Sequence, residues 1–204
     1  MYQEASAKLE LDEIAIILDK LNPKFDGSVF DPVETTILAQ GLSFYPGYRL
    51  LDIADHAEMP PLRRFALYSN SDFIILNFSN EAIYALNQKL PIKLNEKNIT
   101  DYVRFFFTYV RGRHGRFIIT ENTDDIAWKE SPPPAARKAV GKMLIPVTLE
   151  NIGIDGDYQL SATMVFKDSL FKSKIKVDAK GFVSLSDEEL LVEDMPVLND
   201  TFGQ

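Results

Sequence analysis

The chain has 204 residues, 46% of them hydrophobic, so it can bury a sizeable core, and it has no cysteine, which excludes disulfides, thiol nucleophiles and cysteine metal sites. Its net charge of −8 argues against general nucleic-acid binding, because contacts with phosphates need a basic surface. We find no signal-peptide pattern and no apolar run long enough to span a bilayer, and we therefore expect a soluble, cytoplasmic protein without a membrane segment.

Two helices are expected near the N-terminus. Apolar residues at helical spacing predict an amphipathic helix over 6–21, which Asn22-Pro23 ends. Its apolar stripe either packs on the rest of the chain or binds a partner, and packing within the chain is favoured. A second helix is predicted over 32–40, because Asp31-Pro32 suits a helix N-terminus and Gly41 follows the last helical residue.

Strands follow these helices. A strand is predicted at 49–54, and a hairpin is predicted from two strands at 63–68 and 72–78, which flank the turn residues 69–71. Residues 79–94 fit a helix and a short strand equally well.

A long apolar helix is predicted at the centre of the chain, over 95–111. Asn95 or Asn98 can cap its N-terminus, and Gly112 is expected at the C′ position in a left-handed conformation. Apolar and aromatic residues cover most of its circumference, so sheet or other helices must wrap it, and Phe106→Asp should be among the most damaging single changes. Its one polar stripe consists of Asp101, Arg104, Thr108 and Arg111.

A basic turn follows this helix and leads into a strand predicted at 117–120. Gly112 and Gly115 let the backbone come close to a ligand, and arginine side chains suit phosphate or carboxylate groups. The alternative is a solvated loop that pairs with the acidic C-terminal segment, and both interpretations stay open. The candidate anion-binding residues are Arg104, Arg111, Arg113, His114 and Arg116.

The segment 122–142 is the one candidate for an internal domain boundary. It contains Pro132-Pro133-Pro134 and the only tryptophan, Trp128, and a short helix is predicted over 133–140. A mobile lid is one interpretation. A plain connector that Trp128 holds down is the other, and it is favoured.

The C-terminal part predicts a meander of four antiparallel strands with one face in water. The strands are expected within 143–149, 158–166 and 171–177 and from residue 182, with turns at Asp155-Gly156 and Lys180-Gly181. Residues 187–204 are acidic, and the chain past Pro196 is expected to be a loosely ordered tail.

These elements predict an α+β fold. Its antiparallel sheet combines the C-terminal four-stranded meander with a strand or hairpin from the middle of the chain and packs on the one long apolar helix, with the N-terminal helix added. The element order is analogous to the cone of cystatin-like and transport-factor-like domains. The expected division is an N-terminal helix at 1–24, one domain at 25–196 and the tail at 197–204.

Sequence markers of catalysis are missing. The chain has no phosphate-loop, dinucleotide-binding, hydrolase-elbow or zinc-protease motif, and the spacing of His56 from Asp52, Asp55 and Glu58 matches no metal motif. We therefore predict no catalytic residue, no metal and no cofactor.

The sequence favours a non-catalytic binding or assembly module of a bacterial-type intracellular protein, with a second copy or another protein as partner. The alternative is a binding domain for a small phosphate- or carboxylate-bearing ligand at the basic turn 104–116, with enzymatic turnover left open.

Overall fold

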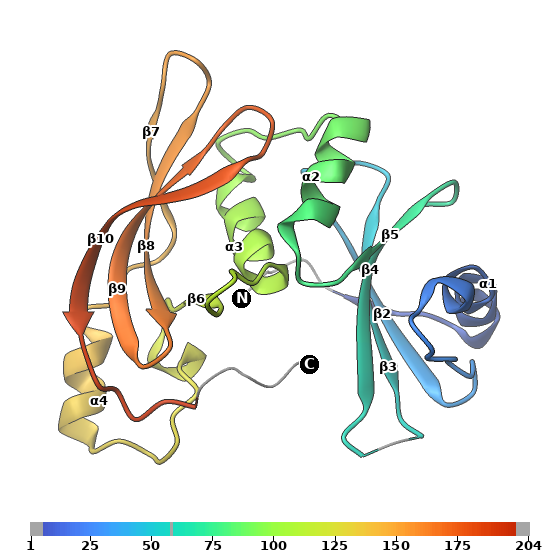
Figure 1. The fold of residues 1–204 in the computed structure, drawn as a ribbon, viewed down its shortest axis with the longest axis horizontal. Helices are drawn as coiled ribbons and strands as arrows, with labels where there is room; N and C mark the ends of the chain where they lie inside the picture. Colours follow the sequence, from blue (N-terminus) through green and yellow to red (C-terminus); the bar gives the residue numbers. More distant parts are fainter. Residues whose placement is uncertain (1–5, 58, 199–204) are drawn as a thin grey trace. The chain divides into compact units, whose positions relative to one another are not determined.

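The computed structural model describes residues 6–57 and 59–198, which form two compact units (Figure 1). The N-terminal unit ends at Asn77 and the C-terminal unit begins at Phe78. Each unit contains a five-stranded antiparallel sheet and at least one helix, so the chain has the predicted α+β class. The segment 122–142 lies inside the C-terminal unit.

The N-terminal unit is a meander in which each strand pairs with the next one along the chain. The strands are β1 (Ala7–Lys8), β2 (Thr35–Gly41), β3 (Arg49–Asp55), β4 (Leu62–Tyr68) and β5 (Phe73–Leu76), and all neighbours are antiparallel. The predicted strand at 49–54 and the hairpin after it are confirmed.

Helix α1 (Leu11–Leu21) is followed by a short 3₁₀ turn, η1 (Asn22–Lys24), and packs on one face of this sheet. Ile14, Ile17 and Leu18 are buried against sheet residues, so the apolar stripe is used within its own unit, as favoured. The helix begins later than predicted because residues 7–8 pair with β2.

The helix predicted over 32–40 is wrong, because residues 35–41 form β2. Thr35, Ile37 and Ala39 are buried at every second position, which is the period of a strand, and all seven residues of β2 pair with β3. The capping signal serves a turn instead, in which the N–H of Val33 donates to Asp31 Oδ1 at 2.7 Å.

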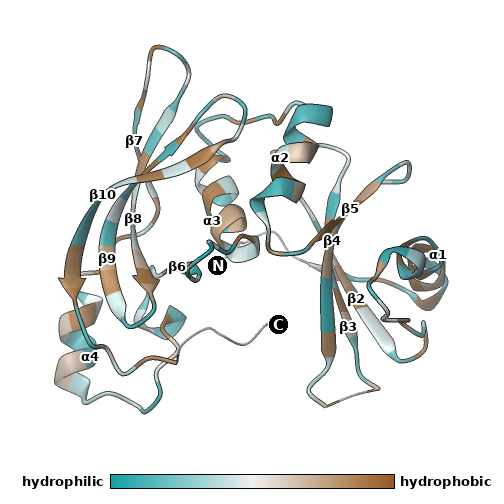
Figure 2. Ribbon diagram, in the orientation of Figure 1, coloured by the Kyte–Doolittle hydropathy of each residue, from teal (hydrophilic) through white to brown (hydrophobic). Residues whose placement is uncertain are grey.

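The C-terminal unit contains the predicted meander. Its sheet has the order β10–β9–β8–β6. Strand β7 also pairs with β8, at residues 158–161, whereas β6 pairs with β8 at residues 164–166. The bounds are β6 (Phe117–Ile119), β7 (Thr148–Ile152), β8 (Tyr158–Phe166), β9 (Ser169–Val177) and β10 (Val183–Val192). Hydrophobic and hydrophilic residues alternate along β9 (Figure 2). Strand β10 begins beside residue 182, as predicted, and continues into the acidic segment.

Two helices of the C-terminal unit precede its sheet, α2 (Asn80–Lys89) and α3 (Ile99–Tyr109). The apolar residues of α3 are buried as predicted, and the Phe106 ring contacts the rings of Tyr84 and Tyr102. Asn98 is the N-cap residue of α3, which is one of the two predicted alternatives, but its side chain makes no capping bond and accepts from the N–H of Asn95 instead. The predicted C-terminal end is wrong, because α3 ends before Gly112 is reached and the N–H of Arg111 donates to Phe78 O.

A second, smaller core of the C-terminal unit includes residues of β8 and β9. It contains the buried side chains of Ile126, Val165, Leu170, Met195 and Val197, next to the short helices η2 (Thr123–Asp125) and α4 (Pro134–Gly141). Trp128 packs on this core, so the connector is held down as favoured. Val197 is buried and pairs with Trp128, which contradicts a loose tail at this residue; residues 199–204 lie outside the described ones.

No helix within residues 6–57 and 59–198 is long and apolar enough to cross a membrane.

Candidate ligand-binding sites

Two of the five candidate anion-binding residues line one cavity of the C-terminal unit. Arg104 comes from α3 and Arg116 from the segment before β6, and the cavity has a volume of about 230 Å³. The remaining lining residues come from α3, β6 and the segment after β6. They are Phe107, Thr108, Ile118, Ile119, Glu121 and Asp125.

The other three candidate residues do not line this cavity. Arg113 and His114 are exposed at the tip of a tight turn, which two backbone hydrogen bonds between Gly112 and Gly115 close at 2.8 and 3.2 Å. The Arg111 guanidinium lies over the Phe78 ring, with its carbon 4.1 Å from the ring centroid. The charged side chains of the basic turn therefore point to different places and do not form one cluster.

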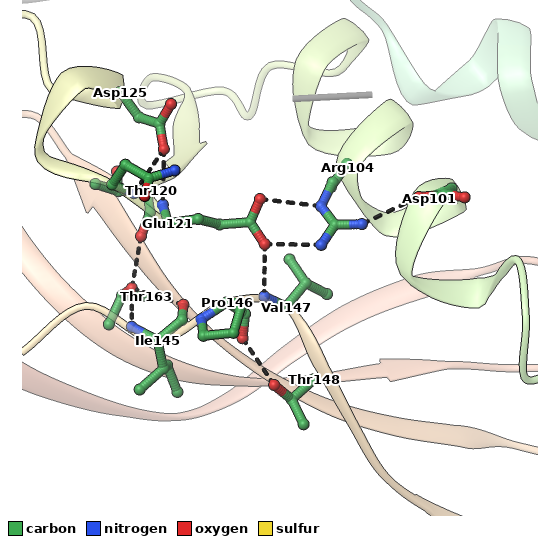
Figure 3. Close-up of polar contacts among 11 residues, drawn as sticks. Asp101, Arg104, Thr120, Glu121, Asp125, Ile145, Pro146, Val147, Thr148 and Thr163 are labelled. Atoms are coloured by element: carbon green, nitrogen blue, oxygen red, sulfur yellow. Dashed lines mark hydrogen bonds and ion pairs between the residues drawn. The ribbon is translucent and has the colours of Figure 1, made fainter. Parts of the chain in front are cut away.

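Arg104 forms the centre of the polar network beside the cavity (Figure 3). Its Nε and one terminal nitrogen donate to the two carboxylate oxygens of Glu121 at 3.0 and 2.8 Å, and its other terminal nitrogen donates to Asp101 Oδ1 at 3.0 Å. The hydrogen bonds from Arg104 to Glu121 raise the pKa of the guanidinium. Such a two-point pair fixes direction as well as distance, so it ties α3 to the segment after β6.

Glu121 is also bound to a third segment of the unit. Its Oε1 accepts from the N–H of Val147 at 2.9 Å, and only 12% of its side chain is exposed. Burial by itself would raise the pKa of Glu121, but the Arg104 guanidinium and the Val147 N–H outweigh it and lower the pKa. Glu121 is therefore a firmly ionised carboxylate.

The backbone on both sides of Glu121 is held by further side chains (Figure 3). Asp125 Oδ2 accepts from the N–H of Glu121 at 2.9 Å and from the N–H of Asn122 at 2.8 Å. The buried Thr163 hydroxyl donates to Thr120 O at 2.6 Å and accepts from the N–H of Ile145 at 3.0 Å. These bonds also explain why β7 starts later than predicted, since the N–H groups of residues 145 and 147 go to side chains instead of a strand partner.

The chemistry open to this cavity follows from these contacts. Both carboxylates in its wall accept N–H groups and hold the backbone, so they stabilise the fold. Among the other lining residues, Arg116 Nε donates to Phe107 O at 3.3 Å, and the exposed Thr108 hydroxyl donates to Arg104 O at 2.7 Å, which leaves its oxygen able to accept.

Sequence reasoning missed Glu121, Asp125 and Thr163. A single glutamate two positions after the apolar strand residues 117–119 was the available signal, but nothing in the sequence links it to an arginine seventeen positions earlier.

The histidine and acidic residues near His56 form no such site. Asp52 and Asp55 are three positions apart on β3, so they point to opposite faces of the sheet, and His56 is exposed. Glu58 lies outside the described residues. Over the described ranges, no group of three or more histidine, aspartate or glutamate side chains could hold a metal ion.

A second cavity, of about 360 Å³, lies between the end of α2 and the β9–β10 turn. No residue in its lining was a candidate in the sequence.

No protein-family model, no curated protein and no solved structure matches this chain.

Proposed function

We propose that this protein is a non-catalytic binding module that holds a small phosphate- or carboxylate-bearing ligand in the cavity between α3 and β6. The observation that carries this proposal is the convergence of Arg104 and Arg116 on one cavity in a chain of net charge −8. Arginine is the side chain best suited to planar or tetrahedral anions, because its N–H groups form a rigid fork.

The two arginines have different roles in this proposal. Arg104 is committed to Glu121 and Asp101, so it shapes the wall and contributes little attraction of its own. Arg116, which also donates to Phe107 O, brings a second guanidinium to the lining, and the Thr108 oxygen, one helical turn after Arg104, accepts from a protonated ligand group.

The non-catalytic part of the proposal rests on the carboxylates. A general base needs a carboxylate that can take up a proton near neutral pH, whereas the pKa of Glu121 is lowered and Asp125 already accepts two backbone N–H groups. Proton transfer at this cavity would therefore work against the contacts that hold the fold.

The assembly form of the proposal has less support. It drew in part on the apolar stripe at 6–21, and that stripe is packed in the core of the N-terminal unit.

The test compares two charge reversals in the same turn, Arg116→Glu and Arg113→Glu. Arg116 lines the cavity, while Arg113 is exposed at the turn tip and does not line it, so both variants change the net charge equally. Phosphate, pyrophosphate and citrate are titrated into the full chain and followed by NMR and thermal shift. A ligand at 100 times its Kd stabilises a protein by about 2.7 kcal/mol.

We expect the wild type and Arg113→Glu to bind one of these anions with the same Kd and Arg116→Glu to bind it at least tenfold more weakly. Equal weakening in both variants would mean that overall charge, and not this cavity, attracts the anion. Absence of binding to the wild type would also refute the proposal.

A further inference from the structure

The second cavity of the C-terminal unit has a different chemical character from the first. Its lining is formed by residues on either side of the end of α2 and by the β9–β10 turn, and it shares no residue with the Arg104 cavity. The lining residues are Asn87, Gln88, Pro91, Ile92, Ala179, Lys180 and Phe182. Its volume of about 360 Å³ lies in the range typical of small-molecule sites.

A buried chain of hydrogen bonds lies beside this cavity. Tyr102, fully buried on α3, donates its hydroxyl to Gly181 O at 2.6 Å, and the Asn87 amide donates to the same hydroxyl at 3.4 Å. Gly181 has a φ of +79°, and a Cβ there would lie 2.6 Å from the Asn87 amide nitrogen. Glycine is therefore required at this position, and the polar groups beside the cavity are partnered without a ligand.

The β9–β10 turn, which forms the other side of the cavity, is also held in shape by contacts within the protein. Asp178 Oδ1 accepts from the N–H groups of Lys180 at 2.8 Å and Phe182 at 2.9 Å, which sets the shape of the turn. The Tyr84 ring lies 4.4 Å from the Phe182 ring, and its hydroxyl accepts from the N–H of Val183 at 3.2 Å. A preformed cavity loses little conformational freedom when a ligand enters.

The charges at this cavity offset one another. Lys180 is the only charged residue in the lining, and it is exposed. The C-terminal end of α2, which carries a partial negative charge and has Lys89 in its last turn, borders the same cavity through Gln88, and the Asp178 carboxylate lies two residues from Lys180. Neither an anion nor a cation is favoured there, while Pro91, Ile92, Ala179 and Phe182 provide apolar surface.

We infer that this cavity is a second ligand site, specific for a small, uncharged, largely apolar molecule with a ring that packs against Phe182. Phe182 is 39% exposed, so the aromatic surface is accessible to such a ligand. The site shares no lining residue with the Arg104 cavity.

The test uses uncharged and charged probes of similar size on the full chain, followed by NMR: indole and benzyl alcohol as uncharged probes, benzoate and benzylamine as charged ones. Ala179→Trp fills the cavity from an exposed position in the turn. Gln88→Trp, exposed on the facing helix, fills it independently if the first variant does not fold. Ile154→Trp is the matched control, because Ile154 is fully exposed in the β7–β8 turn and does not line the cavity.

We expect both uncharged probes to bind the wild type and Ile154→Trp equally and to bind each cavity-filling variant at least tenfold more weakly. The inference is wrong if a folded cavity-filling variant binds them like the wild type, or if neither uncharged probe binds the wild type. It is also wrong if either charged probe binds more tightly than the uncharged ones.

Discussion

Each unit contains a mostly buried carboxylate on or beside its sheet. We expect one of these charges to stabilise the fold and the other to destabilise it. In the C-terminal unit, the Glu121 side chain is 12% exposed and accepts from Arg104 and from the N–H of Val147. In the N-terminal unit, the Asp52 side chain is 27% exposed, and its buried Oδ1 accepts no hydrogen bond from any described residue. Its nearest cation is Arg63, 3.9 Å away and mostly exposed.

The pKa values of these two groups move in opposite directions. The contacts of Glu121 overcome the effect of burial and lower its pKa, whereas burial raises the pKa of Asp52 more than Arg63 can lower it. The partner of a buried charge, and not its depth, therefore decides whether that charge stabilises the fold.

The largest expected effect comes from placing an unpaired carboxylate deeper than Asp52. Phe106→Asp does this at a residue that is 5% exposed and surrounded by aromatic rings. We expect a loss of more than about 5 kcal/mol, so that the C-terminal unit no longer folds, as measured by circular dichroism and NMR. Thr108→Asp, exposed on the same helix, should keep the fold; a folded Phe106→Asp variant would contradict the prediction.

The next largest effect is expected from Glu121→Gln, which leaves Arg104 without its charged partner. We expect the free energy of unfolding to fall by about 2–3 kcal/mol at pH 7, less than for a fully buried pair because both side chains keep some exposure. Because the folded-state pKa of Glu121 is below its ordinary value of 4.5, its contribution is present above that value and is lost as the pH falls through the folded pKa.

Urea denaturation over a pH series measures this effect. The stability difference between the wild type and Glu121→Gln should shrink below pH 4.5. A difference that does not change with pH would show that the carboxylate charge is not its source.

Asp52→Asn should have the opposite sign and a smaller size. Removing the charge should stabilise the protein by about 1 kcal/mol at pH 7. The folded-state pKa of Asp52 lies above its ordinary value of 3.8, so the wild type loses stability as the pH rises through the folded pKa, and the gain should vanish below pH 3.8. Asp55→Asn is the control on the same strand. It keeps an oxygen for the N–H of Ala57 and should change stability little in the same denaturation series.

The smallest effect is expected from Glu13→Gln, which breaks the pair between α1 and Arg49. This pair has an N–O distance of 2.7 Å, close to that of Arg104 and Glu121, but its side chains are 36% and 43% exposed. We expect a loss below about 1 kcal/mol that decreases further in high salt. A loss equal to that of Glu121→Gln in the same denaturation assay would mean that exposure does not govern these pairs.

Local patterns predicted the elements whose own residues decide their structure. Strands β8 and β9 have a period of two and clear turn residues, and α3 is apolar on most sides, so these elements were predicted correctly. Strand β2 was mistaken for a helix, because two capping signals flank it and only its pairing with β3 selects the strand. The prediction for the C-terminal end of α3 was wrong for a similar reason, since the N–H of Arg111 donates to Phe78 O and the helix ends before Gly112 is reached.

For the candidate sites, too, local patterns could be predicted and long-range pairings could not. By itself, the sequence determined the class of fold, the apolar central helix and a turn rich in arginine, because each depends on neighbouring residues. Only the tertiary structure separated Arg116 from Arg113, paired Arg104 with Glu121, and placed Tyr102 against Gly181, 79 residues further along the chain. These pairings depend on how the chain returns to itself, and the loops that bring it back carry no local pattern that names the partner.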